Sequence, residues 1–208
     1  MSYSIGLALN RSNQGWLRPG AIGAWLALAV LATPLALAAR SDTDPELLER
    51  LRAAAREPAS SFSDRFEAEV WLADMSTRLG NRISDDDERI AILKGVHAEA
   101  EKHDLPPELV LAVIEIESNF DRFAISYAGA QGLMQVMPFW LDEIGRPNDN
   151  LFHIETNLRM GCTILRHYLD KENGDLVRGL ARYNGSLGRT VYSNKVLDRL
   201  RTRWRRIE

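Results

Sequence analysis

The chain has 208 residues, with 26 Lys and Arg against 29 Asp and Glu, so its formal net charge is −3. A slightly acidic chain lacks the positive field that attracts phosphates, and this argues against a nucleic-acid-binding protein. Cys162 is the only cysteine, which excludes an intrachain disulfide.

Residues 1–39 have the pattern of a targeting segment. They contain Arg11 and Arg18 but no acid, and a mostly apolar run from residue 21 to 39 ends in small residues, Ala36-Leu37-Ala38-Ala39. This pattern predicts a secretory signal peptide cleaved near residue 38 or 39. The alternative is an uncleaved membrane anchor, because about 18 apolar residues approach the minimum for a membrane span. Without residues 1–39 the net charge is −5, and the remaining chain suits one domain with a sizeable core.

Residues 40–83 are predicted to form a helical extension. Asp44-Pro45-Glu46 is a start signal for a helix over residues 47–56, and Pro58 follows it. A second helix is expected from Ser63 or Asp64 to Gly80. We find no chemistry in this extension, which either braces the following domain or links it to the membrane.

The acidic run 84–88 is predicted to begin the helix that continues to about residue 103. Ser84 is the expected N-cap, and acids in a first turn are favoured by the helix dipole. A metal site is disfavoured because consecutive acids fan out around a helix and no histidine cluster accompanies them. Neither metal nor organic cofactor is expected, since the chain also lacks a phosphate-cradling glycine loop.

Residues 107–117 are predicted to form a helix buried on most faces, because apolar residues lie too densely for a one-sided helix. Its start is marked by Asp104 as the expected capping residue and by the helix-initiating Pro106-Pro107. Glu115 and Glu117 are about 200° apart on such a helix, so they point to different sides. Burial at the end of this helix favours the neutral form of Glu117.

The segment 118–138 leaves two interpretations open. It is first polar and glycine-rich and then apolar around Gln135, with Pro138 at its end. A buried glutamine requires a partner, which is either internal or a substrate. The segment is therefore either a turn followed by a second core helix over residues 133–137, or part of a binding cleft.

The rest of the chain is also predicted to be helical. Helices are expected over residues 139–145, 154–171, 176–183 and from about 192 to 207, and no strand pattern occurs. Cys162 lies on the apolar stripe of the second of these and is interpreted as a small core residue. The arginines of the last helix are interpreted as a solvated face rather than a polymer-binding surface.

Three blocks in the chain resemble the soluble-lytic-transglycosylase (SLT) family. They are Glu117-Ser118-Asn119-Phe120, the block 129–138 (GAQGLMQVMP) and Ala181-Arg182-Tyr183-Asn184-Gly185, in the family's order. The resemblance covers about residues 90–200. It implies a mainly α, lysozyme-like catalytic domain, which we expect over residues 84–208, acting on peptidoglycan glycan strands. Together with export through residues 1–39, it also implies a periplasmic, cell-envelope location. Contact with the membrane is expected only if residues 1–39 are not cleaved. Protein partners are not indicated.

The resemblance also implies roles for particular residues. Glu117 matches the catalytic acid and base, and Tyr183 the tyrosine that approaches it. Other positions match residues that line the sugar cleft, namely Ser118, Ser126, Met134, Gln135 and Asn184. The chain departs from the family at Tyr127, at residues 152–154 and at residues 185–188, all in expected loops, which puts subsite preference in doubt more than the reaction.

Three functions remain open at the level of sequence. The resemblance implies a lytic transglycosylase, which cleaves the MurNAc–GlcNAc β-1,4 bond without water and leaves a 1,6-anhydromuramoyl end. A muramidase-type hydrolase would need a second carboxylate in the cleft, for which Glu115, Asp121 and Asp142 are candidates. A non-catalytic glycan-binding protein has no need of a buried acid at position 117.

Overall fold

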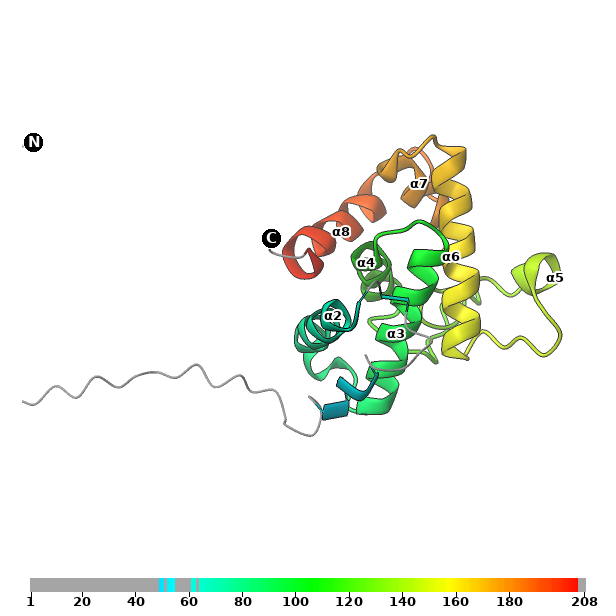
Figure 1. The fold of residues 1–208 in the computed structure, drawn as a ribbon. Coiled ribbons are helices and arrows are strands. Elements are labelled where there is room, and N and C mark those ends of the chain that lie inside the picture. Colours follow the sequence, from blue (N-terminus) through cyan, green and yellow to red (C-terminus); the bar gives the residue numbers. More distant parts are fainter. Residues whose placement is uncertain (1–48, 51, 55–60, 63, 206–208) are drawn as a thin grey trace, which may run out of the picture. The chain divides into compact units, whose positions relative to one another are not determined.

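A computed structural model describes residues 49–50, 52–54, 61–62 and 64–205 (Figure 1). These residues fall within one compact unit that begins at Ser41. The predicted signal peptide or anchor, residues 1–39, lies outside the described residues. Among the described residues, no helix is both long enough and apolar enough to cross a membrane.

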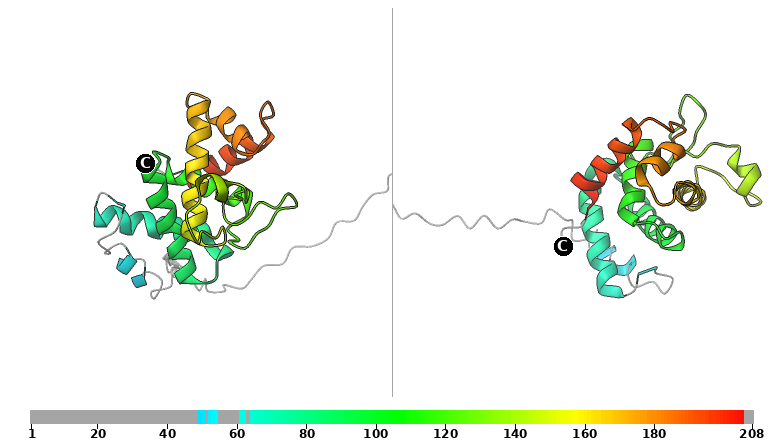
Figure 2. Two further views of the ribbon diagram at one scale, coloured as in Figure 1. Left: turned by 90° about the vertical axis from the view of Figure 1, so that its right-hand side faces the viewer. Right: turned by 90° about the horizontal axis from the view of Figure 1, so that it is seen from above.

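Helices dominate the described chain. Their order is α2 (Arg65–Leu79), η1 (Gly80–Arg82), α3 (Asp86–Lys102), α4 (Pro107–Glu117), α5 (Trp140–Ile144), α6 (Ile154–Lys171), α7 (Leu176–Tyr183), α8 (Val191–Arg199) and η2 (Leu200–Trp204). Within residues 64–205 extended pairing is limited to isolated bridges, Ile125 with Gln131 and Gln131 with Val136. The predicted mainly α class is confirmed. Figure 2 shows α5 standing away from the other helices.

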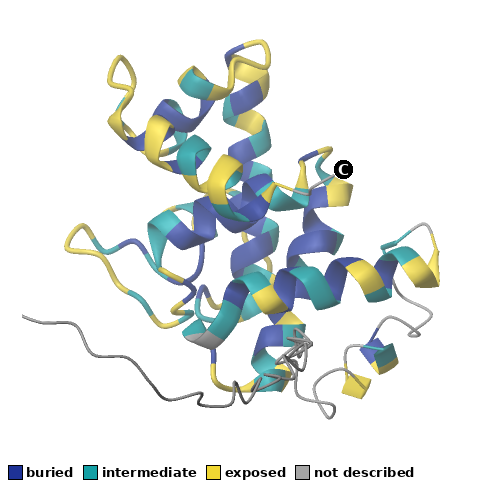
Figure 3. Cartoon of the chain, turned by 90° about the vertical axis from the view of Figure 1, so that its left-hand side faces the viewer, coloured by how far each residue is buried: buried dark blue, intermediate teal, exposed yellow. Residues whose placement is uncertain are grey.

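The core is built around α4, which packs against α3, α8 and η2. Residues 109–114 of α4 are fully buried, as the dense apolar pattern predicted (Figure 3). The predicted capping role of Asp104 was wrong. Its φ of 51° places it in a left-handed turn, and Pro106 is the N-cap. Pro107 opens the helix, where its missing N–H leaves no helical hydrogen bond unmade.

Helix α2 packs against α3 and η2. Asp64 caps it by accepting a hydrogen bond from Glu67 N at 2.8 Å, and Gly80 ends it, as predicted. Trp71 is buried on α2, and its indole Nε1 donates to Glu108 Oε1 of α4 at 2.9 Å.

The N-cap of α3 is Asp85, one residue later than the predicted Ser84. Its side chain accepts from Glu88 N at 3.0 Å. The shift is physically small, because Asp and Ser cap equally well and the acidic first turn is retained. In the part of the chain that the structure describes, no group of three or more His, Cys, Asp or Glu side chains converges to hold a metal ion.

The loop between α4 and α5 replaces the second core helix that one interpretation expected over residues 133–137. Two residues of this loop, Gly132 and Gln135, have φ of 76° and 50°, which a right-handed helix does not permit. A side chain at Gly132 would collide with Asn157 and with the carbonyl oxygen of Leu151. The apolar run is buried here by close loop packing against α6 rather than by helix formation.

The C-terminal helix is divided. It is an α-helix from Val191 to Arg199 and a π-helical turn from Leu200 to Trp204, in which Arg205 N donates to Leu200 O at 2.7 Å. Trp204 is fully buried. The last two residues of the predicted helix, 206 and 207, lie outside the described residues.

Candidate active site

Glu117 is the last residue of α4 and is half-buried beside the C-terminal helices. Removal from solvent disfavours its charged form and raises its pKa from 4.5 to about 7. A hydrogen bond from the Tyr192 hydroxyl to Glu117 Oε1, 2.5 Å long, acts in the opposite direction. The balance leaves a carboxyl group that is half protonated near neutral pH, as a general acid requires.

Glu117 opens into a cleft of about 470 Å³, which we call the Glu117 cleft. Its wall is formed by the end of α4, the loop after α7 and the first turns of α8. The lining residues are Ile116, Glu117, Asn184, Ser186, Arg189, Val191, Tyr192 and Lys195. Glu117 is the only carboxylate among them.

The family resemblance implied that Tyr183 is the tyrosine that approaches Glu117. In the structure, the hydroxyl of Tyr183 instead donates a hydrogen bond to the carbonyl oxygen of Met134 at 2.6 Å. Tyr192 donates to Glu117. Burial and the neighbouring Glu117 carboxylate hold the pKa of both phenols well above 10, so both hydroxyls remain donors. The expected donation from Tyr183 is thus corrected to Tyr192, and Tyr183 instead supports the loop backbone.

Met134 is also placed differently from the expectation that it lines a sugar cleft. Its side chain is fully buried and packs against Gly161 of α6, where an added Cβ would collide with it. Its backbone is held from both sides, because Met134 N donates to Asn157 Oδ1 at 2.8 Å and its carbonyl accepts from Tyr183. Asn157 is buried and also donates from Nδ2 to Gln131 O and Leu151 O. This asparagine therefore fixes the loop that follows Glu117.

The remaining predicted lining residues have internal partners. Ser118 is the C-cap of α4 and its hydroxyl donates to Leu133 O at 2.8 Å. Gln135 donates from Nε2 to Ala124 O and Gly132 O, so the partners of its half-buried amide are internal. Ser126 Oγ accepts from Ala130 N within its own turn. Only Asn184, the C-cap of α7, lines the Glu117 cleft.

Glu115 points away from this cleft, as its position on the helix predicted. Its Oε2 accepts from the indole Nε1 of Trp204 at 2.8 Å. Its Oε1 lies 3.2 Å from Arg82, 3.4 Å from Arg199 and 3.6 Å from Arg203. Arg199 is exposed and Arg203 is half-buried, so the predicted solvated face agrees with the structure, and the same two arginines also supply countercharge to the buried carboxylate.

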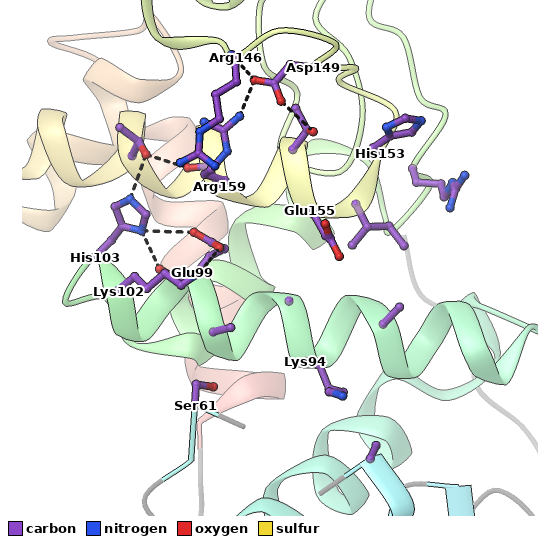
Figure 4. Close-up of a pocket in the computed structure, with 18 of the residues that line it drawn as sticks. Ser61, Lys94, Glu99, Lys102, His103, Arg146, Asp149, His153, Glu155 and Arg159 are labelled. Atoms are coloured by element: carbon purple, nitrogen blue, oxygen red, sulfur yellow. Dashed lines mark hydrogen bonds and ion pairs between the residues drawn. The ribbon is translucent and has the colours of Figure 1, made fainter. Parts of the chain in front are cut away.

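The other two candidate second carboxylates also lie outside the lining of the Glu117 cleft. Asp121 Oδ1 accepts from Phe123 N in a tight turn, and Asp142 is exposed on α5. A larger hollow of about 1150 Å³ lies between α3, α6 and the loop before α6 (Figure 4). Its charged groups are largely paired with one another, as Lys102 is with Glu99 and Arg159 with Asp149. It contains none of the predicted site residues.

Sequence reasoning missed most of the cleft wall. Tyr192 lies outside the three blocks that carry the family resemblance, and no site role was predicted for it. Nothing in the local pattern around Ser186, Arg189 or Lys195 distinguishes them from ordinary surface residues, and only the fold brings them beside Glu117.

This helical domain, with one partly buried acid and a hydroxyl donor in a cleft, has the arrangement of a single-carboxylate acid catalyst. Residues 95–198 match the family model described as "Transglycosylase SLT domain". The chain therefore belongs to the SLT family, as its three sequence blocks indicated.

The relatives are longer proteins. The chain is 31% identical over 100 residues to a transglycosylase of Enterobacteria phage PRD1, which covers 48% of this chain and 37% of the phage protein. It is 35% identical over 95 residues to membrane-bound lytic murein transglycosylase F of Desulfosudis oleivorans, a match that covers 43% of this chain and 20% of that protein. Lytic transglycosylase Slt of Pseudomonas aeruginosa superposes with a TM-score of 0.42 at 24% identity, covering 73% of this chain and 31% of Slt. The chain thus spans little more than a third, or less, of their lengths.

Proposed function

We propose that this chain is an exported peptidoglycan lytic transglycosylase. Membership of the SLT family and the names of its relatives support the reaction class. The observation that carries the proposal is Glu117, a carboxyl group with a pKa of about 7 and the only acid lining its cleft.

Glu117 acts first as the acid. In its protonated form, it gives its proton to the glycosidic oxygen as the bond to the muramoyl C1 breaks, and positive charge develops at that carbon. The resulting carboxylate then takes the proton of the muramoyl C6 hydroxyl. The C6 oxygen bonds to C1, which closes the 1,6-anhydro ring, and Glu117 regains its proton.

Tyr192 is suited to both stages of this cycle. Its hydroxyl hydrogen bond stabilises the carboxylate form of Glu117 once the proton has left. It also orients Oε1 on a rigid helix, which keeps the acid in a productive geometry.

A hydrolase is the less supported alternative. An inverting enzyme requires a second carboxylate about 6.5–9.5 Å from the acid, with room for water between them. Glu115 is bound by arginines and Trp204, and neither Asp121 nor Asp142 lines the cleft.

Mass spectrometry of the muropeptides released from purified sacculi tests the reaction. The full chain is expected to release products about 18 Da lighter than reducing ends, because intramolecular capture replaces water. Glu117→Gln should release none, whereas Glu143→Gln, a change to an exposed acid of α5, should release the same products as the parent. Reducing ends that carry solvent oxygen would show a hydrolase, and binding to sacculi without products from the parent would show a binding protein.

Export rests on residues 1–39 and is tested separately. We expect the protein recovered from the cell envelope to begin near residue 39 or 40, as measured by intact mass. An intact N-terminus in the membrane fraction would instead identify this segment as an anchor.

A further inference from the structure

Arg189 and Lys195 place two cations on the wall of the Glu117 cleft. Arg189 lies in the loop before α8, and Lys195 lies on α8 three residues after Tyr192, on the same helix face. Both side chains are exposed. The structure gives neither of them an ion pair or a side-chain hydrogen bond with another described residue.

This lack of a partner sets the two cations apart from the neighbouring arginines. On α7, Arg178 and Arg182 pair with Glu172, and at the end of α8 Arg199 pairs with Glu115. In a chain with more acids than bases, two cations without an ion pair among the described residues line the same cleft as Glu117, the one acid of its lining.

Neither cation forms an ion pair with Glu117 in the described part of the chain. Burial raises the pKa of Glu117, and the hydrogen bond from Tyr192 opposes that rise. Cations that contacted the carboxylate would favour its charged form, so they would lower its pKa and reduce the fraction of Glu117 that is protonated. Their exposed position therefore suits a group on the ligand rather than the acid.

We propose that Arg189 and Lys195, which we call the cationic rim, bind a carboxylate of the peptide carried by the muramoyl residue. This inference rests on the proposed function. The amino sugars of the glycan are N-acetylated and neutral, so the anionic groups nearest the cleaved bond are the carboxylates of that peptide. A guanidinium and an ammonium on one cleft wall fit such a group. The rim thus makes the enzyme prefer peptide-bearing glycan to bare glycan.

Binding without turnover tests this preference. The full chain carrying Glu117→Gln is titrated calorimetrically with soluble peptide-bearing glycan fragments and with the same fragments stripped of peptide by an amidase. We expect about 3- to 10-fold tighter binding of the peptide-bearing fragments at low salt, a preference that 0.3 M NaCl reduces. Adding Arg189→Gln and Lys195→Gln should abolish the preference and leave the affinity for stripped glycan unchanged.

Matched controls are exposed cations outside the cleft, Lys171→Gln and Arg205→Gln, which should keep the preference. Equal affinity for both fragments in the parent, or an equal loss on both in the rim variant, would overturn the proposal. Because this measurement needs no turnover, it remains decisive if the product assay finds a hydrolase. The product assay therefore tests the transglycosylase proposal, and the binding preference tests the cationic rim independently of it.

Discussion

At the residue scale, the reactivity of Glu117 follows from the end of one apolar helix. The preceding residues of α4 are buried, so the carboxyl group at its C-terminus loses much of its hydration. Carboxylates at helix C-termini are also disfavoured by the helix dipole. One hydroxyl donor, Tyr192, offsets part of this cost and sets the direction of the group.

The raised pKa of Glu117 predicts a stability change as well as a catalytic one. A carboxyl group whose folded pKa lies at about 7, above 4.5, contributes stability below pH 4.5 and loses it as the pH rises through 7. Glu117→Gln has no proton to lose, so it should be more stable than the parent at pH 8 by about 2 kcal/mol and little changed at pH 4. Urea unfolding at both pH values measures this. Equal stability of variant and parent at pH 8 would contradict the raised pKa, and Glu143→Gln is the control.

The identity of the partner tyrosine predicts a pH–rate difference. Tyr192→Phe removes the hydrogen bond that lowers the pKa of Glu117, so this pKa should rise further. The alkaline limb of the rate profile should then move to higher pH, while the maximal rate falls about 10-fold because the acid is less well oriented.

Tyr183→Phe is the matched comparison, because its hydroxyl contacts the Met134 carbonyl instead. It should lower stability by about 1 kcal/mol without moving the alkaline limb. If Tyr183→Phe moved that limb and Tyr192→Phe did not, the assignment of the two tyrosines would be reversed.

At the element scale, α8 and η2 are fixed to α4 at two points. Glu117 is bonded to Tyr192 of α8, and two residues earlier Glu115 is bonded to Trp204 of η2 and paired with Arg199 and Arg203. The C-terminal segment α8–η2 therefore donates the hydrogen bond to Glu117, and Glu115 anchors the same segment to α4. We infer that Glu115 is a positioning residue for Glu117.

Glu115→Ala should expose this coupling. It leaves the Trp204 N–H and three arginines without their carboxylate, so the free energy of unfolding should fall by about 3–5 kcal/mol. Because Tyr192 is then held less firmly, the alkaline limb of the rate profile should move upward, as in Tyr192→Phe. Glu115→Gln, which keeps an acceptor for Trp204, should show a smaller loss.

A buried carboxylate elsewhere provides the comparison for Glu115. Glu172 is buried and pairs with Arg178 and Arg182 between α6 and α7. Glu172→Ala should also lower the free energy of unfolding, because it removes the partner of two arginines, but it should not move the alkaline limb. A Glu115→Ala variant that is destabilised but has an unchanged pH profile would make its role purely structural.

The sequence was most informative about single elements with a strong pattern. The dense apolar run of α4 and the stripe of α6 were predicted with nearly correct ends, because Pro107 and Gly174 mark those ends locally. The run 133–137 was ambiguous because four apolar residues around one glutamine are equally compatible with a helix and with a packed loop. Its conformation depends on Asn157, which lies on another element.

At the scale of the whole molecule, the sequence predicted the acid but little of its surroundings. Glu117 follows from an apolar helix and a family block, both of which are contiguous in sequence. The cleft wall is assembled from α4, the loop after α7 and α8, and its cations have no local signature. The choice between Tyr183 and Tyr192 likewise depends on how α7 and α8 pack, which no local pattern encodes.

We propose that helix α2 of the extension 40–83 folds with the catalytic domain as one unit. Trp71 is buried, packs between α2 and α3 against His97, and is bonded to Glu108 of α4. Trp71→Ala should therefore lower the free energy of unfolding of the entire unit by about 3–5 kcal/mol. Phe66→Ala, on the exposed face of the same helix, should change it by less than about 0.5 kcal/mol.

The shape of the unfolding curve distinguishes a brace from an independent segment. If α2 is part of the core, far-ultraviolet circular dichroism and tryptophan fluorescence should report one coincident urea transition in the parent, moved as a whole in Trp71→Ala. Two separated transitions, with only the weaker one moved by the substitution, would show that α2 is a separate unit beside the domain. In that case the Glu117 cleft should keep its full activity in Trp71→Ala at 25 °C, whereas a brace for α3, α4 and η2 predicts that activity is lost together with the fold.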